Sequence, residues 1–189
     1  PIDGALVLAD YQTRGRGRTR QRRWVSARGR NLLFNLVLNE NTVGPRPQRL
    51  PLLSGLAIAR ALEKMFDLSC QLKWPNDVII DSCKVAGCLC ERISGWYSLG
   101  IGITCNQVLS LPKRFSAGLS ATSIRRVLGY PISRWELLEV FLSEIYNLLR
   151  APFSSEDINQ RLFARGHWVR ISDAGHQIPE IAKVVRIGT

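Results

Sequence analysis

An amide, a carboxylate and an ammonium group occur close together near the middle of the chain. The run Lys-Trp-Pro-Asn-Asp ends in Asn76 and Asp77, and Lys84 follows shortly afterwards. Residues 78–80 and 85–89 are short β-rich runs with a turn at 81–83 between them, so the pattern predicts a hairpin. A hairpin would return Lys84 to Asp77 at one mouth. Such a cluster could bind an anion or move a proton, and it is also typical of a turn with a solvated ion pair.

A second chemically suited group is the arginine- and glycine-rich segment 13–23. The arginines in and just after it are Arg14, Arg16, Arg18, Arg20, Arg22, Arg23, Arg28 and Arg30. The segment has no apolar period, so we expect it to be mobile without a ligand. Its glycines let the backbone approach an anion, and guanidinium groups supply planar pairs of donors. The same composition fits a solvated basic loop or a nucleic-acid-binding arm.

Composition indicates a globular domain with an anionic partner. The 189 residues are enough for one domain with a core, and the net charge of +11 favours a nucleic acid, a nucleotide or an acidic protein. No apolar run approaches the roughly 18 residues of a membrane span, so no membrane partner is expected.

Cysteine usage and the first residues predict a cytoplasmic location. The five cysteines are odd in number and contain no CxxC pair, which favours free thiols in a reducing compartment over disulfides or a metal site. Residues 1–4 lack the basic start of a secretory signal.

Two motifs stand out by their length and spacing. One is Lys73-Trp74-Pro75-Asn76-Asp77 followed by Lys84-Val85-Ala86-Gly87, and the other is Gln12-x-x-Gly15-Arg16-Gly17-Arg18 followed by Trp24 and Gly29-x-Asn31-Leu32. Both closely resemble motifs of the biotin protein ligases, members of the biotin/lipoate ligase superfamily that adenylate biotin and attach it to a carrier lysine. A five-residue block with a following Lys-x-x-Gly is far more specific than a lone glycine motif.

The resemblance, which covers residues from about 5 to about 170, implies a fold. We expect an α/β domain of the α+β type, in which helices cover a mixed, mainly antiparallel sheet of the class II aminoacyl-tRNA-synthetase kind. The catalytic domain is expected at residues 1–165, and the start of a small SH3-like C-terminal β segment at 166–189. No helix-turn-helix pattern precedes this core, so a repressor form is not expected.

Periodicity places the elements. Strands are expected at 5–9 (a buried one), 32–38, 70–74 and 97–104, with helices at 50–66, from a capping box at Ser133 and Glu136 to about 149, and from 154 or 155 to 163. Residues 42–49 are expected to form a loop.

The resemblance also implies the site residues. Lys84 and Asp77 are the predicted catalytic pair. The predicted biotin- and adenylate-binding residues are Gln12, Gly15, Arg16, Gly17, Arg18, Trp24, Asn76, Gly87, Gly100, Gly102 and Asn106. The two strand glycines match a Gly-x-Gly-x-Asn motif of the family in which Thr104 replaces the Asn, and we expect Asn106 to lie on the same face and substitute. The loop before Trp24 is about one residue longer than is usual in the family.

The implied reaction has two steps. The carboxylate of biotin attacks the α-phosphate of ATP, giving biotinyl-5′-AMP and pyrophosphate, and a lysine of a biotin carboxyl carrier protein then attacks the acyl carbon. Arg16, Arg18 and Lys84 would offset the repulsion between the two anions. Asn76 and Asp77 could hold Mg²⁺ or the nucleotide. Asp77 could also accept the proton of the acceptor lysine, whose free pKa is about 10.4.

Three other functions stay open at this point. A lipoate or octanoate transferase shares the fold, although such enzymes as a rule lack the Trp-Pro-Asn-Asp block. A nucleic-acid-binding module would use the arginine segment and lose affinity steeply with salt. A ligase-like protein without activity is compatible with Thr104. A homodimer through edge strands is a further expectation, whereas nucleic acid is not the favoured partner.

Overall fold

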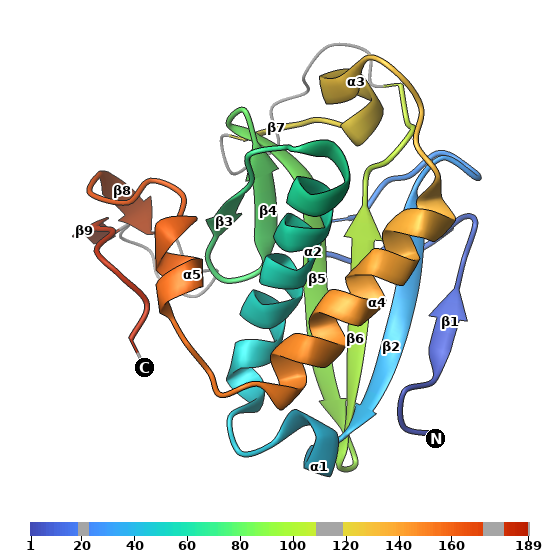
Figure 1. Cartoon of the computed structure of the whole chain (residues 1–189), viewed down its shortest axis with the longest axis horizontal. Coiled ribbons are helices and arrows are strands. Elements are labelled where there is room, and N and C mark those ends of the chain that lie inside the picture. The colour runs from blue at the N-terminus through green and yellow to red at the C-terminus, as the bar shows by residue number, and fades with distance from the viewer. Residues whose placement is uncertain (19–22, 109–118, 172–179, 189) are drawn as a thin grey trace.

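A mainly antiparallel sheet with two long helices across one face forms the body of the protein in the computed structural model (Figure 1). The structure describes residues 1–18, 23–108, 119–171 and 180–188. The strands are β1 (Leu6–Leu8), β2 (Leu32–Asn39), β3 (Gln71–Lys73), β4 (Asp77–Ile80), β5 (Cys83–Ile93), β6 (Trp96–Ile103), β7 (Ser120–Ala121), β8 (Trp168–Ile171) and β9 (Glu180–Lys183). The helices are α1 (Glu40–Val43), the 3₁₀ turn η1 (Pro47–Arg49), α2 (Leu50–Phe66), α3 (Ile124–Leu128), α4 (Arg134–Arg150) and α5 (Glu156–Gln160). The predicted α+β class is confirmed.

Tight hairpins build the centre of the sheet. The strand order is β1-β2-β6-β5-β4-β3, with antiparallel neighbours throughout, and β7 pairs in parallel with β5. Asp81 and Ser82 link β4 to β5 with φ of 48° and 59°, and Ser94 and Gly95 link β5 to β6 with φ of 47° and 80°. Positive φ at both positions lets a two-residue turn follow the twist of the strands. The predicted hairpin is confirmed, with Cys83 belonging to the strand and not to the turn.

Strand alternation divides the sheet into a helix-covered face and a second face. Phe34, Leu36 and Leu99 point toward α2 and α4, where they join the main core. Leu33 and Ile79 lie on the other side and are nevertheless buried, at 2% and 0% exposure. The second face is therefore covered around these positions, and the predicted site residues of the strands lie on it.

The two long helices follow from their sequence signals. α2 has Pro at its start, and its C-cap Asp67 adopts the left-handed conformation with φ of 55°. At the start of α4, the hydroxyl of Ser133 accepts a hydrogen bond from the backbone N–H of Glu136 at 3.3 Å, as the capping box predicts. Phe141 of α4 meets Phe34 edge to face, with ring centroids 5.2 Å apart. Among the described helices, none is both long and apolar enough to cross a membrane.

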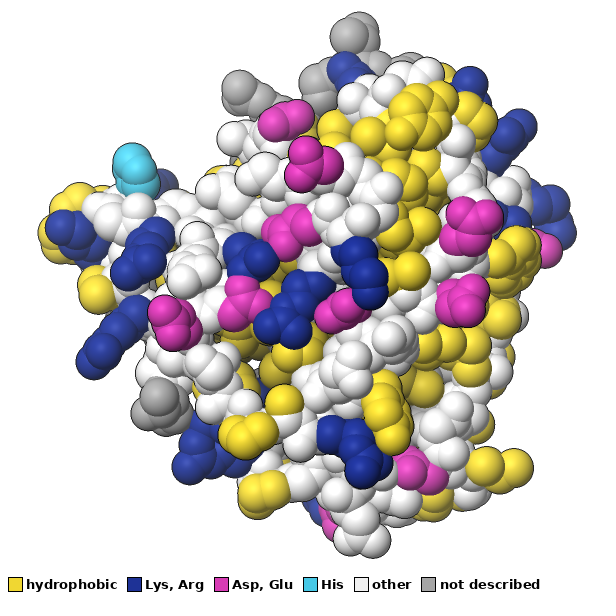
Figure 2. Space-filling model, in the orientation of Figure 1, with side chains coloured by type: hydrophobic (Ala, Val, Ile, Leu, Met, Phe, Trp, Pro, Cys, Tyr) yellow, Lys and Arg dark blue, Asp and Glu magenta, His cyan; other side chains and the backbone are white. Residues whose placement is uncertain are grey.

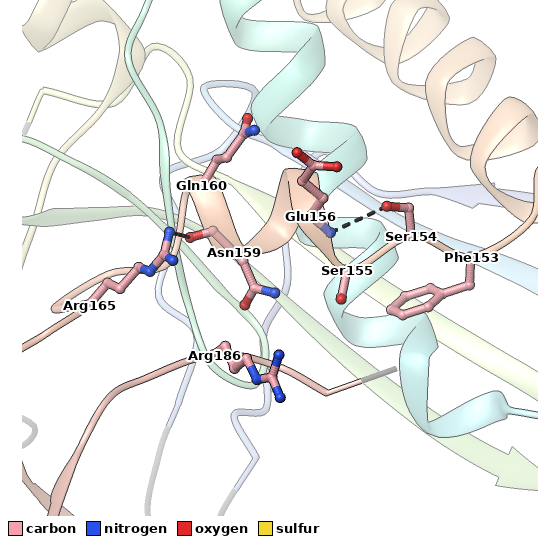
Figure 3. A pocket seen from close by; sticks show the side chains of 8 residues that line it. All are labelled: Phe153, Ser154, Ser155, Glu156, Asn159, Gln160, Arg165 and Arg186. Carbon is pink, nitrogen blue, oxygen red and sulfur yellow. Dashed lines mark hydrogen bonds between the residues drawn. The ribbon is translucent and has the colours of Figure 1, made fainter.

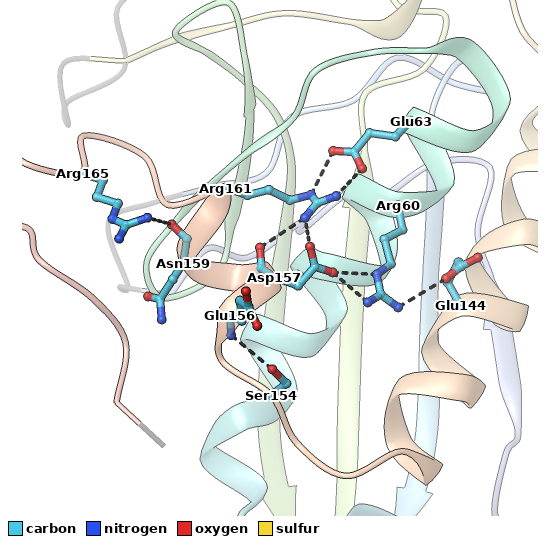
Figure 4. Close-up of polar contacts among 9 residues, drawn as sticks. All are labelled: Arg60, Glu63, Glu144, Ser154, Glu156, Asp157, Asn159, Arg161 and Arg165. Carbon is cyan, nitrogen blue, oxygen red and sulfur yellow. Dashed lines mark hydrogen bonds and ion pairs between the residues drawn. The ribbon is translucent and has the colours of Figure 1, made fainter.

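Ion pairs join α2, α4 and α5 on the outer face, where positive and negative side chains alternate (Figures 2 and 4). Arg60 of α2 contacts Asp157 of α5 at 2.7 Å and Glu144 of α4 at 3.8 Å. Arg161 contacts Glu63 of α2 at 2.7 Å and also pairs with Asp157. Because several charges share partners, the network orients three helices more firmly than isolated surface pairs would.

Three expected elements differ in the structure. β1 is a strand as predicted, but it is not buried, because it lies at the edge of the sheet; Val7 and Leu8 are 61% and 43% exposed. The expected loop at 42–49 overlaps α1 and contains η1. The last predicted helix ends at Gln160 rather than at 163.

The C-terminal segment packs beside α5. β8 and β9 pair in antiparallel fashion, and residues 172–179 between them lie outside the described part of the chain. The amide of Asn159 donates to the backbone carbonyl of Ile187 at 3.2 Å and accepts from its N–H at 2.7 Å. Ile187 also packs against the main core. The division into units 1–165 and 166–189 stays a prediction.

Thiol accessibility checks this arrangement of the core. Burial raises the pKa of Cys70, Cys88 and Cys105 to about 12 in each case, and all five cysteines are free. Because the thiolate is the reactive species, we expect iodoacetamide at pH 8 to label Cys83 first in the native chain, and Cys90 more slowly because partial burial raises its pKa as well; the three buried cysteines should stay unlabelled. Peptide mass spectrometry before and after denaturation measures this. Rapid native labelling of Cys88 or Cys105 would contradict the burial of β5 and of the segment that follows β6.

Candidate functional site

The central hairpin brings Lys84 and Asp77 into direct contact. Lys84 Nζ donates to Asp77 Oδ1 at 2.6 Å, and the two side chains are 29% and 16% exposed. A break in the strand register next to Ile79 sets Lys84 opposite that residue. Asn76 is fixed beside them, because its amide donates to the carbonyl of Cys88 at 2.7 Å. The expected contact between the carboxylate and the ammonium group is confirmed, while the amide of Asn76 is bound to the backbone of β5.

A pair of opposed glycines lies beneath this cluster. Gly87 of β5 stands directly across from Gly102 of β6, and we call this pair the glycine floor. A Cβ atom added to Gly87 would lie 2.9 Å from Lys84 Nζ and 3.3 Å from Asp77 Oδ1. The absence of a side chain at Gly87 therefore leaves the space through which Lys84 reaches Asp77.

Trp24 lies against the other half of the floor. A Cβ atom on Gly102 would lie only 2.6 Å from Trp24 Cε2, so the indole packs directly on the backbone of β6. Lys84 Nζ lies 5.8 Å from the centre of the same ring, which is within the range of a cation–π contact. Gly100 is different, because a Cβ atom added to it would have the carbonyl oxygen of Leu89 as its nearest neighbour, at an ordinary contact distance of 3.6 Å.

The residues around Trp24 form an arm across the second face of the sheet. We call residues 12–18 and 23–24 the arginine arm; residues 19–22 lie outside the described part. The N–H of Trp24 donates to the carbonyl of Gly15 at 3.1 Å, and Arg16 bridges to Arg23 in antiparallel fashion. A Cβ atom on Gly15 would lie 2.4 Å from Trp24 O and 3.1 Å from Gln12 Oε1. Only glycine allows this close approach, so the motif glycine shapes the arm.

The arm carries its arginines away from the hairpin cluster. The Arg16 side chain is 70% exposed and its Nη2 donates to Glu91 Oε2 of β5 at 2.8 Å. Gly17 is half-buried, and Arg18 is exposed without a polar partner among the described residues. The structure thus brings Trp24 to Lys84, but it does not bring the two guanidinium groups there.

Asn106 occupies a different place from the one expected. β6 ends at Ile103, so strand alternation does not extend to residue 106. Its amide donates to the carbonyl of Ile132 and accepts from the N–H of Ile132, each at 2.8 Å. Asn106 therefore anchors the start of α4, and its contact with a ligand stays a prediction. The backbone of Thr104 bonds to Val85 at 2.9 Å.

Glu91 is the residue of this region that sequence reasoning missed. Residues 87, 89 and 91 alternate along β5, so Glu91 lies on the same face as the glycine floor. A carboxylate on that face of β5, in a chain with an arginine-rich segment, was the available signal.

A separate cavity lies between α5 and the C-terminal tail (Figure 3). It measures about 560 Å³ and is lined by Phe153, Ser154, Ser155, Glu156, Asn159, Gln160, Arg165 and Arg186. None of the predicted site residues lines it. The described residues also contain no group of three His, Cys, Asp or Glu side chains suited to a metal ion.

Comparison with known proteins links the motifs to one family. Residues 2–107 match the model of the biotin/lipoate A/B protein ligase family. The bifunctional ligase/repressor BirA of Bacillus subtilis is 33% identical over 148 residues, which are 74% of this chain and 44% of that protein. The biotin–[acetyl-CoA-carboxylase] ligase of Mycobacterium tuberculosis is 31% identical over 110 residues, covering 56% of this chain and 41% of that protein. This chain therefore spans less than half the length of these two relatives.

A solved structure matches the whole described fold. The biotin protein ligase of Aquifex aeolicus in complex with biotin and ATP superposes with a TM-score of 0.83 at 28% identity, covering 100% of this chain and 80% of that one.

The two strand glycines should respond differently to a methyl group. We expect Gly102→Ala to expel the Trp24 ring and to lower the free energy of unfolding by about 1–3 kcal/mol, the usual cost of overpacking. Gly100→Ala is the matched control, because its Cβ meets nothing closer than 3.6 Å. Urea denaturation gives the stability, and the rate of trypsin cleavage after Arg23 reports whether the arm has loosened. Equal behaviour of the two variants would refute the packing of Trp24 on β6.

Proposed function

Because the chain belongs to the biotin/lipoate A/B protein ligase family, we propose that it is an ATP-dependent biotin protein ligase. It would activate biotin as biotinyl-5′-AMP and transfer the biotinyl group to a lysine of a biotin carboxyl carrier protein. The observation that carries this proposal is the Lys84–Asp77 pair, held at 2.6 Å above the glycine floor and beside Trp24. Four residues of the two family motifs meet at that point.

The choice of biotin over lipoate rests on the motif and on the relatives. The block that ends in Asn76 and Asp77 is the feature that lipoate and octanoate transferases as a rule lack. Relatives named as biotin ligases, and a similar structure described as a complex with biotin and ATP, support the same two small molecules as substrates here.

The first step must join two anions. A carboxylate oxygen of biotin would attack the α-phosphorus of ATP, and pyrophosphate would leave with the electrons of the broken P–O bond. Repulsion opposes this approach, and the ammonium of Lys84 would offset it at the reacting oxygens. Its position is pre-set by Asp77 and by the space above Gly87. Arg18, exposed on the arginine arm, could reach the phosphate as a planar donor.

The second step needs a neutral amine. The amine of the acceptor lysine would attack the acyl carbon, and AMP would leave as the acyl–phosphate bond breaks. The displaced proton requires an acceptor, and Asp77 is the carboxylate at this position. Its Oδ1 already accepts a hydrogen bond from Lys84. The hydrogen bond between Lys84 and Asp77 can therefore rearrange over a short distance between the two steps.

Trp24 has an unmet hydrogen bond that a ligand could satisfy. Its indole N–H and the hydroxyl of Ser26 are buried without a partner among the described residues. A buried donor without an acceptor costs about 1–3 kcal/mol. An acceptor atom of a bound substrate would remove that cost, which favours Trp24 as a wall of the pocket.

A magnesium ion at this mouth would be held mainly by ATP. Mg²⁺ prefers oxygen ligands, keeps several waters and is usually bound through one or two carboxylates with substrate phosphates. Asp77 and the carbonyl oxygen of the Asn76 amide are the predicted protein ligands at the mouth. Such an ion would neutralise phosphate charge. The carrier partner, a homodimer and a cytoplasmic location also stay predictions.

Removing the ammonium group tests the first step. We expect Lys84→Ala to lower biotin-dependent ATP–pyrophosphate exchange by at least about 100-fold, because a preorganised charge at the reacting oxygens is lost. Lys64→Ala is the control, since Lys64 is a 65%-exposed partner of Glu144 on the outer face.

The same assay separates the substrates. Exchange that persists in a folded Lys84→Ala variant would contradict the role of Lys84. Exchange driven by lipoate and not by biotin would replace the proposed substrate. Wild-type chain without either activity would refute the ligase proposal.

Ligand binding should also protect the arginine arm. We expect saturating biotin with a non-hydrolysable ATP analogue to slow trypsin cleavage after Arg14, Arg16, Arg18 and Arg23 by about tenfold or more, because contacts with the ligands order the arm. Cleavage after Arg150, at the end of α4, provides the internal reference. Equal cleavage rates with and without the ligands would refute closure of the arm.

A further inference from the structure

We propose that Glu91 is a positioning residue, whose carboxylate holds Arg16 and thereby fixes the arginine arm over the glycine floor. Arg16 Nη2 donates to Glu91 Oε2 at 2.8 Å, across 75 residues of sequence. The use of this contact in ligand binding rests on the proposed function, whereas the contact itself does not.

Strand geometry sets where the contact lies. Glu91 is four positions beyond Gly87 on β5 and shares its face, so the two are about 13 Å apart at roughly 3.3 Å per residue. The Lys84–Asp77 pair is at one end of this stretch, and the Arg16–Glu91 pair is at the other. The arm therefore spans a strip of sheet on which a small elongated ligand could lie.

The arm has a second attachment on the neighbouring strand. Trp24 packs on Gly102 of β6, and its N–H bonds to the carbonyl of Gly15 at 3.1 Å. Trp24 of the arm is thus held on β6 by packing, and Arg16 of the arm is held on β5 by an ion pair. Loss of the Glu91 contact would remove the ion pair between Arg16 and β5 and leave the backbone contacts of residues 15 and 16 with Arg23 and Trp24.

The charge of the arm explains why a carboxylate is needed. Arg14, Arg18 and Arg23 have no carboxylate partner among the described residues, so their like charges oppose ordering of the arm. Glu91 supplies a negative charge where Arg16 of the arm reaches β5. Because the pair is 70% and 39% exposed, it can change an equilibrium by about two- to five-fold rather than act as a rigid clamp.

Preorganisation is the expected consequence. With Glu91→Gln the arm spends less time in place, and binding must then supply the ordering, so the apparent affinity falls by the loss of competent population. We expect the KM for biotin to rise about two- to five-fold with kcat unchanged at saturation. A defect in the chemical step would lower kcat instead.

The decisive measurement is limited trypsin digestion of the full chain without ligands. We expect Glu91→Gln to speed cleavage after Arg16 and Arg18 about two- to five-fold at low salt, and the difference from wild type to vanish at about 1 M NaCl, where exposed charges are screened. Glu40→Gln is the matched control. Its exposed pair with Arg92 lies next to Glu91 along β5 but on the opposite face of the strand, and among the described residues it has no contact with the arm.

Charge exchange provides the second variant. The double variant Arg16→Glu with Glu91→Arg restores an opposite pair, and we expect cleavage after Arg18 and Arg23 to return toward the wild-type rate. Unchanged cleavage in Glu91→Gln, or equal acceleration in Glu40→Gln, would overturn the proposal. Since these digestions use no substrate, an inactive wild-type chain would refute the ligase function and leave this test unaffected.

Discussion

The contact between Lys84 and Asp77 depends on a place in the sheet where two opposed glycines, Gly87 and Gly102, leave the surface without side chains. The ammonium group reaches the carboxylate because Gly87 has no Cβ to block it. Trp24 can lie beside Lys84 because Gly102 has no side chain either. These constraints belong to two strands whose register places the glycines opposite each other. The hairpin turns, the core and the long helices maintain this alignment, since a slip of one strand by one residue would turn the site residues of that strand to the other face.

Charge is distributed on the protein in two different ways. On the outer face, Arg60, Arg161 and their acidic partners form a shared network that joins three helices. On the site face, most arginines of the arm have no carboxylate partner among the described residues. Unpaired positive charge is costly in a folded chain and favourable toward an anion. Eight arginines of this chain, whose net charge is +11, occur between positions 14 and 30, so the arm and the residues just after it carry a large share of the positive charge.

Much of this could be predicted from local signals. A turn between two β-rich runs gave the hairpin, and apolar periodicity with a capping serine gave α2 and α4. Edge position was not predictable in β1, because three apolar residues look alike in a central and an edge strand. The position of Asn106 was not predictable, because it depends on partners outside β6. The backbone N–H of Asn106 donates to the carbonyl of Arg30 at 2.7 Å, and its side chain bonds to Ile132. The spacing of residues cannot show such partners.

The pairing of Arg16 illustrates the limit most clearly. Arg16 and Glu91 are both present in the sequence, and the alternation of side chains along β5 could have placed Glu91 on the face of Gly87. Their contact nevertheless depends on the path of the arm, which is set by the close approach of Gly15 to Trp24 and by the packing of the indole on β6. A weak, exposed ion pair forms only where stronger constraints have already brought the chain together. For this reason the backbone glycines of the motifs determine where the charged side chains can act.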